Sequence, residues 1–505
     1  MTFEQNTTIE SPAELILVIV FDGLRPDMIT SSTTPNLEKW AAEGCWFRNS
    51  SSIFPTMTRV AAASISTGSY PSSHGIINNV FFHPSLSADT ALNTSQFHEI
   101  QTAERFFHNR LITAVSLGEK LAEKNFSISI AHGGSAGSAY MLNHKAKLNS
   151  HRTFSIHGAE NCTTSEAVSD AISIHGKIPK LDVPRHTICR YLTDVFLATT
   201  LAPPLPAVGC IWYPEPDTSF HHRGIGSEDS FAILRSIDTE FGRIIDWVET
   251  QPNKERIGVI VLSDHGQITV TEQVDLAGIL SESGFPTSSK PLDKHIFSFT
   301  NGRTNEIRLR THDQYLLKDL VSFLTERPEI GMLFSNPILR DHDLPEGTLE
   351  MKKIMADHSR APDLYAILYD DDTINNLGIK GCGLFTGGVP VGFGMHGGLS
   401  KYEVNNVLML AGVGVTHKEI CHAPAGLIDL APTILHWLGI NEQTGEGRVL
   451  DEAFGSSVIP GTSVVDTASH GQYQQQLTTI SHKNQRYIVE GKRIKPGLES
   501  EPHTC

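Results

Sequence analysis

Runs of apolar residues alternate with longer amphipathic segments through most of the chain. Residues 15–21, 208–213, 257–263 and 406–412 form mostly apolar runs. Unbroken runs of this length are typical of strands buried on both faces of a sheet. Helices are predicted for the segment after Thr34, which has Pro35 in its first turn and Gly44 beyond its end, and for 227–249 and 425–439. This β–α alternation predicts an α/β fold with a mostly parallel sheet flanked by helices.

A different pattern interrupts this alternation between about 271 and 392. The segments HIFSFT, NEIRLR, YLLKDLVSFLTERPE and DLYAILY predict a small α+β unit. We therefore divide the chain into a discontinuous core (1–270 and 393–460), an insert or cap (271–392) and a peripheral C-terminal tail (461–505). The Gly- and Ser-rich stretch 133–140 lacks a phosphate-loop signature and is interpreted as a flexible connection.

Composition narrows the possible partners and location. The 505 residues carry a formal charge of −16, so no basic surplus exists to bind nucleic acid. The first apolar run has seven residues and no preceding Lys or Arg, which fits neither a secretory signal nor a membrane span. Seven scattered cysteines without a CxxC pair are typical of reduced thiols. We therefore expect a cytoplasmic protein that contacts neither nucleic acid nor membrane.

Acidic residues and histidines occur beside the ends of the predicted strands. The set comprises Asp22, Asp217, His221, Asp264, His265 and His396. In sheets of this kind, ligands bind at the carboxyl ends of the strands. Each residue alone reads as a turn or helix cap, but three Asp and three His together fit two divalent ions such as Zn²⁺. Two metals about 3.5–4 Å apart form a clamp for in-line displacement at phosphorus.

The segment 51–79 contains a candidate nucleophile. Residues from Thr58 to Thr67 are helix-like, and Gly68 is a stop signal. Thr58 would lie near a helix N-terminus, where free backbone N–H groups favour an anion. An ordinary threonine cap is the alternative interpretation.

Five motifs resemble the nucleotide pyrophosphatase/phosphodiesterase family of the alkaline phosphatase superfamily in order and rough spacing. They are FDG (21–23), STGSYPSSHGIINN (66–79), EPDTSFHH (215–222), VLSDHG (261–266) and MHGG (395–398). The resemblance covers about 14–80, 205–270 and 393–455. It implies an alkaline-phosphatase-like core and a hydrolase of phosphodiester or phosphoanhydride bonds.

The resemblance also implies roles for individual residues. It places the nucleophile at Thr58 rather than Thr56, with a covalent phosphothreonine intermediate, and the phosphoryl-binding asparagine at Asn79. It further implies two Zn²⁺ per chain. One zinc falls on Asp22, Thr58, Asp264 and His265, and the other on Asp217, His221 and His396.

The sequence departs from the family beside the nucleophile. Nucleotide-selective members have an aromatic residue and a Pro-Asn-His stretch there, whereas this chain has Arg59, Val60 and Ala61. Arg59 could bind an additional anionic group of the substrate, or it could face solvent or pair with a local carboxylate. Lys145 and Lys147 resemble the Lys-x-Lys pair that binds the substrate carboxylate in phosphonoacetate hydrolase, although lysines in a polar segment are usually solvated.

These observations leave several functions open. The first is a zinc hydrolase of phosphodiesters or phosphoanhydrides. A C–P hydrolase resembling phosphonoacetate hydrolase, or a phosphomonoesterase, could use the same site. A phosphate mutase and a non-catalytic metal-binding protein are further alternatives. In each catalytic case we expect a small anionic substrate that contains phosphate or phosphonate.

Overall fold

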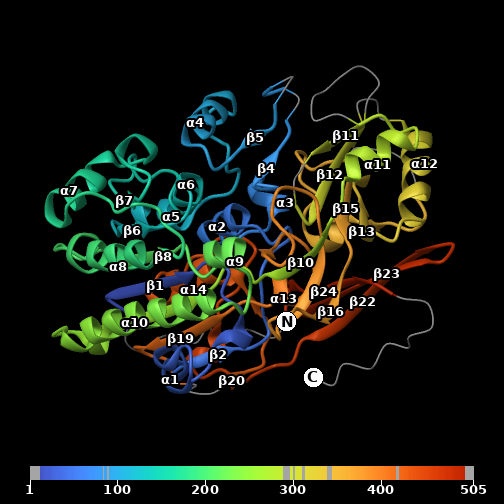
Figure 1. Cartoon of the computed structure of the whole chain (residues 1–505). Helices are drawn as coiled ribbons and strands as arrows, with labels where there is room; N and C mark the ends of the chain where they lie inside the picture. Colours follow the sequence, from blue (N-terminus) through green and yellow to red (C-terminus); the bar gives the residue numbers. More distant parts are fainter. Residues whose placement is uncertain are drawn as a thin grey trace.

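The structure is a computed structural model, and it describes residues 12–83, 85–87, 90–287, 296–299, 302–309, 313–337, 344–416 and 420–494. An eight-stranded sheet runs through the larger part of the molecule in the order β20–β2–β19–β9–β1–β8–β6–β7 (Figure 1). Its strands are β1 (Leu15–Phe21), β2 (Cys45–Phe47), β6 (Ile128–His132), β7 (Arg152–Ser155), β8 (Val208–Tyr213), β9 (Ile257–Leu262), β19 (Leu408–Gly412) and β20 (Ile420–Cys421).

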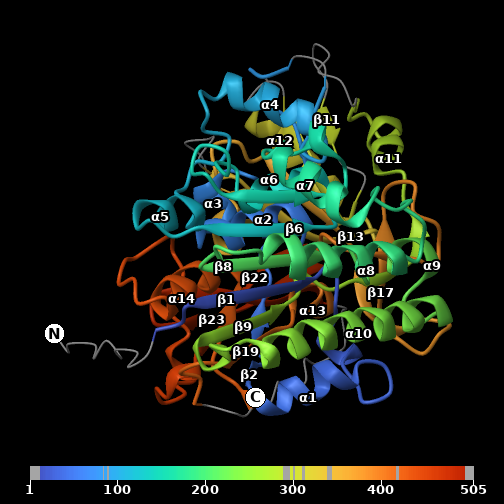
Figure 2. The ribbon, with the colours of Figure 1, turned by 90° about the vertical axis from the view of Figure 1, so that its left-hand side faces the viewer.

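The central strands of this sheet are parallel. β7, β6, β8, β1 and β9 run in one direction, and β19 is antiparallel to both β9 and β2. Figure 2 shows β6, β8, β1, β9, β19 and β2 following one another down the sheet. The predicted α/β fold with a mostly parallel sheet is confirmed.

Helices cover both faces of the sheet, because β1 directs alternate apolar residues to opposite sides. Ile16, Val18 and Val20 belong to the core that includes α2 (Thr58–Thr67), α4 (Phe97–Phe106), α5 (Leu117–Glu123), α6 (Ala136–Leu142) and α14 (Leu430–Trp437). Leu15, Leu17, Ile19 and Phe21 belong to the core with α1 (Pro35–Glu43), α7 (Ser165–His175), α8 (His186–Val195), α9 (Asp217–Arg223) and α10 (Glu228–Thr250). This two-sided burial explains why the strands are unbroken apolar runs.

Several predicted helices match closely, but two segments differ. α1, α2 and α10 begin and end within a residue or two of their predicted bounds. The segment from 425 forms a short strand, β21 (Ala425–Gly426), paired with β3 (Ser50–Ser51), so that α14 begins only at Leu430. The stretch 133–140 is not a flexible connection, since most of it lies in the buried helix α6.

The insert contains two sheets. One has the order β11–β12–β15–β13–β14 and the other β16–β17–β10–β18. Their strands are β10 (Ile268–Gln273), β11 (Ile296–Phe299), β12 (Thr304–Leu309), β13 (Ile330–Ser335), β14 (Leu349–Glu350), β15 (Leu364–Leu368), β16 (Asp370–Ile374), β17 (Lys380–Phe385) and β18 (Gly394–Met395). Helices α11 (Leu276–Glu282) and α12 (Gln314–Thr325) share a core with the first sheet. β10 pairs with β18, Ile268 opposite Met395, so this sheet extends beyond both predicted boundaries of the insert.

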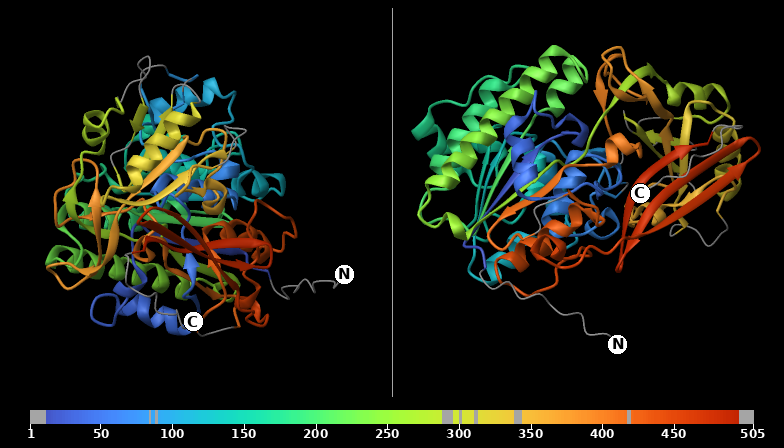
Figure 3. Two further views of the ribbon diagram at one scale, coloured as in Figure 1. Left: turned by 90° about the vertical axis from the view of Figure 1, so that its right-hand side faces the viewer. Right: turned by 90° about the horizontal axis from the view of Figure 1, so that it is seen from below.

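The C-terminal segment is a packed sheet and not a peripheral tail. It comprises β22 (Thr462–His470), β23 (Tyr473–His482) and β24 (Gln485–Arg493), which lie beside the strands of the insert (Figure 3). Leu477 and Ile488 share a core with Phe334 and Ile367 of the insert. The buried Gln475 amide also donates to the carbonyl oxygen of Leu333, at 2.9 Å. The alternating polar residues of these strands concealed this packing in the sequence.

Smaller elements complete the fold. They are α3 (Pro71–His74), α13 (Lys401–Val404), β4 (Val80–Phe81) and β5 (Leu92–Asn93). Within the described ranges, no helix combines the length and the apolar character that crossing a bilayer requires.

Candidate active site

The site forms where three adjacent parallel strands end. Asp22 follows β1 directly, Asp264 comes two residues after β9, and Asp217 begins α9 just beyond β8. In the register of the sheet, Phe21 lies opposite Tyr213, and Val20 lies opposite Leu262. The three carboxylates therefore emerge at one edge of the sheet, as their positions in the sequence predict.

Asp22 and Asp264 are buried, and each has one oxygen without a donor. Asp22 Oδ2 accepts from Trp212 Nε1 at 3.0 Å, and Asp264 Oδ1 accepts from the backbone N–H groups of Gly23 and His265, both at 3.0 Å. Asp22 Oδ1 and Asp264 Oδ2 have no hydrogen-bond partner among the described residues. Burial raises the pKa of both carboxyl groups, and their mutual repulsion raises the pKa of Asp22 further.

His265 faces these two oxygens. Its Nδ1 lies 3.1 Å from the carbonyl oxygen of Gly266, which can only accept a hydrogen bond, so Nδ1 carries the proton and Nε2 of the neutral ring has a lone pair. Nε2 lies 3.2 Å from Asp264 Oδ2 and 3.7 Å from Asp22 Oδ1. Burial lowers the pKa of His265 to about 4, which favours the neutral ring. A lone pair that faces two carboxylate oxygens is repulsive unless a cation lies between them, so this donor set fits a metal ion.

A second group contains Asp217, His221 and His396. Asp217 Oδ1 lies 3.1 Å from His221 Nε2 and 3.5 Å from His396 Nε2. The Nδ1 atoms of the two histidines lie 2.7 Å from the carbonyl oxygens of Gly394 and Thr56. Such backbone contacts at Nδ1 fix the ring and direct Nε2 to a metal. Burial lowers the pKa of His396 to about 4, whereas Asp217 raises the pKa of His221 despite burial.

The two groups adjoin each other. The rings of His265 and His396 stack with centroids 3.8 Å apart. Ligand atoms of Asp22, Asp217 and His265 lie within 4.8 Å of one another, as do those of Asp217, His221 and His396. Asp217 thus belongs to both groups, whereas the sequence analysis assigned it to one ion and gave Asp264 to the other. All six predicted ligands converge on one place.

Thr58 lies beside this cluster at the first position of α2. Its Oγ1 is 3.2 Å from His265 Nε2. The Thr56 hydroxyl is used differently, because it donates to the carbonyl oxygen of Gly398 and accepts from the N–H of Gly397, both at 3.0 Å. Thr56 is fully buried and fastens the loop that carries His396. The geometry therefore places Thr58, and not Thr56, at the candidate metal groups.

Asn79 lies at the same helix end. Its Oδ1 accepts from the backbone N–H of Arg59 at 3.1 Å. The backbone N–H of Asn79 donates to Asn78 Oδ1 at 2.7 Å. The Asn79 side-chain amide is thereby held at the N-terminus of α2. An amide N–H₂ at a helix N-terminus can donate to the oxygens of a phosphoryl group.

Two residues that support the ligands carried no signal in the sequence. Trp212, inside β8, binds Asp22 as described above. The buried Gln267 donates from Nε2 to Asp217 Oδ1, and its Oε1 has no partner in the described part of the chain. Both contacts join segments far apart in the sequence. Only the proximity of Gln267 to the VLSDHG motif could have indicated a role.

A cavity of about 400 Å³ opens beside the metal groups, a volume suited to a small molecule. It is lined by Asp22, Thr58, Arg59, Ser95, Gln96, Phe97, Gly134, Ser135, Ala136, His157, Asn161, Arg185, Pro214, Asp217 and Thr218. Arg59 therefore reaches the site. Lys145 and Lys147 do not line this cavity. Lys145 pairs with Glu119 at 2.5 Å, and Lys147 is exposed, so the structure does not bring the predicted lysine pair to the site.

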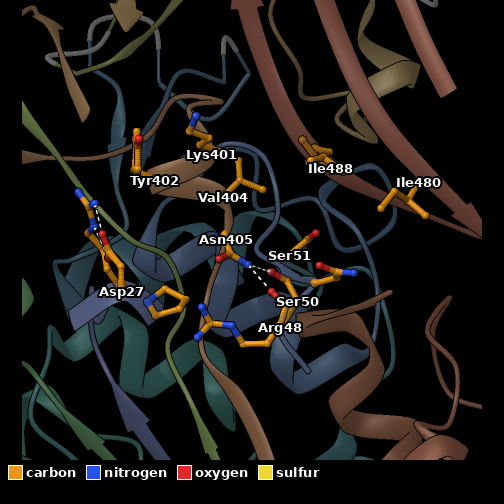
Figure 4. Close-up of a pocket in the computed structure, with 14 residues that line it drawn as sticks. Asp27, Arg48, Ser50, Ser51, Lys401, Tyr402, Val404, Asn405, Ile480 and Ile488 are labelled. Carbon is orange, nitrogen blue, oxygen red and sulfur yellow. Dashed lines mark hydrogen bonds and ion pairs between the residues drawn. The ribbon is translucent and has the colours of Figure 1, made fainter. Parts of the chain in front are cut away.

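A second cavity of about 310 Å³ lies between α13 and the C-terminal sheet (Figure 4). Three cations line it, and each has a partner. Arg25 pairs with Asp27 at 2.6 Å, Lys401 pairs with Asp372 at 2.7 Å, and Arg48 stacks over Trp46 with its guanidinium carbon 4.2 Å from the ring centroid. None of the predicted metal ligands lines this cavity, so its chemistry is separate from theirs.

Comparison with known sequences points to one family. A family model described as type I phosphodiesterase / nucleotide pyrophosphatase matches residues 16–376. Ectonucleotide pyrophosphatase/phosphodiesterase family member 7 of Rattus norvegicus is 23% identical over 262 residues, which is 51% of this chain and 51% of that protein. Bis(5'-adenosyl)-triphosphatase enpp4 of Mus musculus is 23% identical over 304 residues, which is 56% of this chain and 54% of that protein. The chain thus spans about half the length of the curated relatives it matches.

Solved structures agree with this fold. Human ectonucleotide pyrophosphatase/phosphodiesterase 5 superposes with a TM-score of 0.60 at 14% identity, covering 87% of this chain and 100% of that chain. An inactive variant of the murine protein in complex with AMP gives a TM-score of 0.58 at 15% identity, covering 86% of this chain and 96% of that chain. At this identity, the likeness shows the alkaline-phosphatase-like fold alone.

Proposed function

Because the chain belongs to the type I phosphodiesterase/nucleotide pyrophosphatase family, we propose that it is a metal-dependent hydrolase of phosphodiester or phosphoanhydride bonds. One observation carries the proposal. The Thr58 hydroxyl lies at a helix N-terminus, 3.2 Å from His265 Nε2, within a cluster of six Asp and His side chains. A candidate nucleophile, a helix N-terminus and candidate metal ligands lie beside one cavity, which supports the proposal.

The donor sets suit two zinc ions. His265, with Asp22 and Asp264, would hold one ion, while His221 and His396 would hold the other, and Asp217 lies within reach of both. Zinc accepts imidazole nitrogen and carboxylate oxygen together, and three side-chain ligands leave a position open for substrate. Bound there, divalent cations supply Lewis-acid stabilisation of the charge on the attacking and leaving oxygens.

The chain's own residues determine the order of bond changes. Thr58 Oγ1 attacks phosphorus while its proton passes through solvent to the leaving oxygen, so that an O–P bond forms as the bond to the leaving group breaks. Water then cleaves the phosphothreonine and restores the hydroxyl. The Asn79 side-chain amide at the start of α2 would donate to the non-bridging oxygens, which gain negative charge during both steps.

The alternatives use the same site with different substrates. A phosphomonoesterase needs no further group. A C–P hydrolase resembling phosphonoacetate hydrolase needs a carboxylate-binding cation, and Lys145 is engaged by Glu119 at 2.5 Å. The family match favours the diester or anhydride proposal, and the monoester and the phosphonate are outcomes of the test.

The test combines metal analysis with a panel of substrates. Protein purified without chelators should contain about two zinc ions per chain and should hydrolyse a phosphodiester or a nucleoside diphosphate-sugar faster than a phosphomonoester or phosphonoacetate. Dialysis against a chelator should abolish turnover, and added zinc should restore it. Full activity in metal-free protein, or no turnover of any of the four substrates by the zinc-loaded protein, would contradict the proposal.

A further inference from the structure

Two arginines line the cavity that contains Thr58. Arg59 follows the proposed nucleophile directly, and Arg185 lies at the N-terminal end of α8, far away in the sequence. No ion pair joins either guanidinium to a carboxylate within the described ranges. Both residues are partly exposed at this cavity, so their guanidinium groups are accessible to an anion that enters it.

Arg59 is held by neutral groups. Its Nε donates to Thr94 Oγ1 at 2.9 Å, one terminal nitrogen lies 3.4 Å from Ser135 Oγ, and the other lies 3.4 Å from the carbonyl oxygen of Asn79. A guanidinium has five N–H donors, so these contacts orient the group without using all of them. The acids that act on it electrostatically are Asp22 and Asp217, which are both candidate metal ligands.

The position of Arg185 is fixed by a hydrogen bond of its backbone N–H group. Its backbone N–H donates to Glu215 Oε1 at 2.9 Å, and its buried Nε has no partner among the described residues. Glu215 is the nearby carboxylate, but it also accepts from Ser219 N–H at 2.9 Å and forms no ion pair with the guanidinium.

The reacting phosphoryl group already has its own binding groups, namely Thr58, Asn79 and the metal ligands. The arginines are therefore available to a different part of the substrate. Guanidinium groups match the planar, two-oxygen edge of carboxylates and phosphates. His157 and Asn161 line the same cavity and add polar side chains around the same space.

We propose that Arg59 and Arg185 form a subsite for a second anionic group, a carboxylate or a phosphate, on the substrate. The substrate class is then a small phosphorus ester, anhydride or phosphonate that carries a further negative charge on one arm. This inference rests on the proposed function, which gives the position of the reacting phosphorus. It adds that the same site prefers substrates with a second anionic group.

A pair of inert ligands tests the subsite by binding. 2-Carboxyethylphosphonate and 3-methylbutylphosphonate have nearly the same shape and differ in one carboxylate. Calorimetric titration of the zinc-saturated Thr58→Ala protein should show the carboxylated ligand binding about 10- to 150-fold more tightly. Adding Arg185→Gln should remove most of this preference. Adding Arg190→Gln, which removes an exposed charge from the same helix, should leave it intact.

Further variants separate charge from folding. Arg185→Lys keeps the charge without the planar fork and should retain part of the preference. Arg59→Gln should also reduce it. Equal affinity for the two ligands, binding of neither ligand, or a preference that survives both arginine-to-glutamine changes would overturn the subsite. Turnover of the four-substrate panel by the unaltered protein judges the proposed function separately.

Discussion

Thr56 and Thr58 lie two residues apart, yet their hydroxyl groups have different surroundings. The Thr58 hydroxyl faces His265, whereas the Thr56 hydroxyl joins the Gly397–Gly398 loop to the segment before α2. The motif alignment distinguished the two threonines by spacing. The structure adds a physical reason, because a hydroxyl with both hydrogen bonds made inside the protein is poorly placed to attack a substrate.

Thr58→Ala should lower turnover by several orders of magnitude while zinc content and melting temperature stay near those of the unaltered protein. Thr58→Ser should keep part of the activity, because the oxygen remains. Thr56→Ala should instead reduce stability by about 1–3 kcal/mol, since it leaves the buried Gly397 N–H unpaired. Steady-state kinetics and chemical denaturation measure the two effects. Loss of turnover at constant stability in Thr56→Ala would contradict this division of roles.

Gln267 illustrates a supporting contact that the sequence did not reveal. Its side chain donates to Asp217, a member of both candidate metal groups, and orients that carboxylate. Gln267→Leu should weaken zinc binding by about 10- to 100-fold, because partners behind a ligand commonly contribute that much. Titration in a zinc buffer measures the affinity. Gln273→Leu, at the exposed end of β10, which begins one residue after Gln267, is the control and should bind zinc normally.

The candidate site could be predicted from the sequence where strand ends and motifs coincide. Asp22, Asp217, Asp264 and His265 follow strands of the central sheet, whereas His221 lies on α9 and His396 follows β18 of the insert. The lysine pair illustrates the limit, because its short local match said nothing about Glu119, which lies on α5 and engages Lys145. The contacts of Trp212 and Gln267 depend on the register between distant segments, which no single stretch of sequence encodes.

At the scale of helices, caps and packing depend on neighbours in space. α1 begins after Thr34 as predicted, but the Thr34 side chain does not cap it. Asp238 of α10 accepts instead from the backbone N–H groups of Asn36 and Leu37, at 3.1 and 2.8 Å. The bounds of α1 were therefore predictable from Pro35 and Gly44. The carboxylate that accepts from its first backbone N–H groups was not predictable, because Asp238 lies far away in the sequence.

The small residues of α6 resemble those of a flexible linker, although they form a buried helix. Those residues allow close packing, and a Cβ added at Gly137 would lie 1.6 Å from the carbonyl oxygen of Thr94 and 3.1 Å from Arg59 Cδ. The backbone of Thr94 therefore packs directly against this glycine, and the Thr94 hydroxyl accepts the hydrogen bond that orients Arg59. A Gly-rich segment here indicates contact between backbones and not flexibility.

Gly137→Ala should therefore displace the Thr94 segment and destabilise the fold by about 1–3 kcal/mol, the usual range for overpacking. Because Arg59 moves with Thr94, the preference for the carboxylated phosphonate should also fall. Denaturation and the same calorimetric titration measure both effects. Gly388→Ala is the matched control, since a Cβ there meets nothing within 4 Å.

At the scale of the whole molecule, the C-terminal sheet joins the core and the insert. Tyr487 donates to Asp429 Oδ2 at 2.9 Å, and Asp429 also accepts from Gly426 N–H at 2.9 Å. Tyr487 and Asp429 are both buried. The alternating pattern of β22–β24 predicts strands but not their partner, so the sequence analysis left this segment outside the fold.

Tyr487→Phe should lower the free energy of unfolding by about 1.5–3 kcal/mol, because it removes a hydrogen bond to a buried carboxylate. Chemical denaturation measures the loss. Tyr315→Phe, at a side chain that is 73% exposed, should have almost no effect. Equal stability of the Tyr487 and Tyr315 variants would mean that the C-terminal sheet is only loosely attached.

The order of strands in the central sheet also affects how the protein is made. β2 ends at Phe47, yet its neighbour β19, which also covers one edge of β9, begins only at Leu408. During synthesis from the N-terminus, that edge of β9 stays open until β19 has left the ribosome, and His396 emerges only shortly before it. Pairings this distant form slowly, and an open apolar strand edge is prone to aggregate until it is covered. A chain that ends before His396 would lack one of the six candidate metal ligands, so under the proposed function only molecules whose core has closed could hydrolyse the substrate.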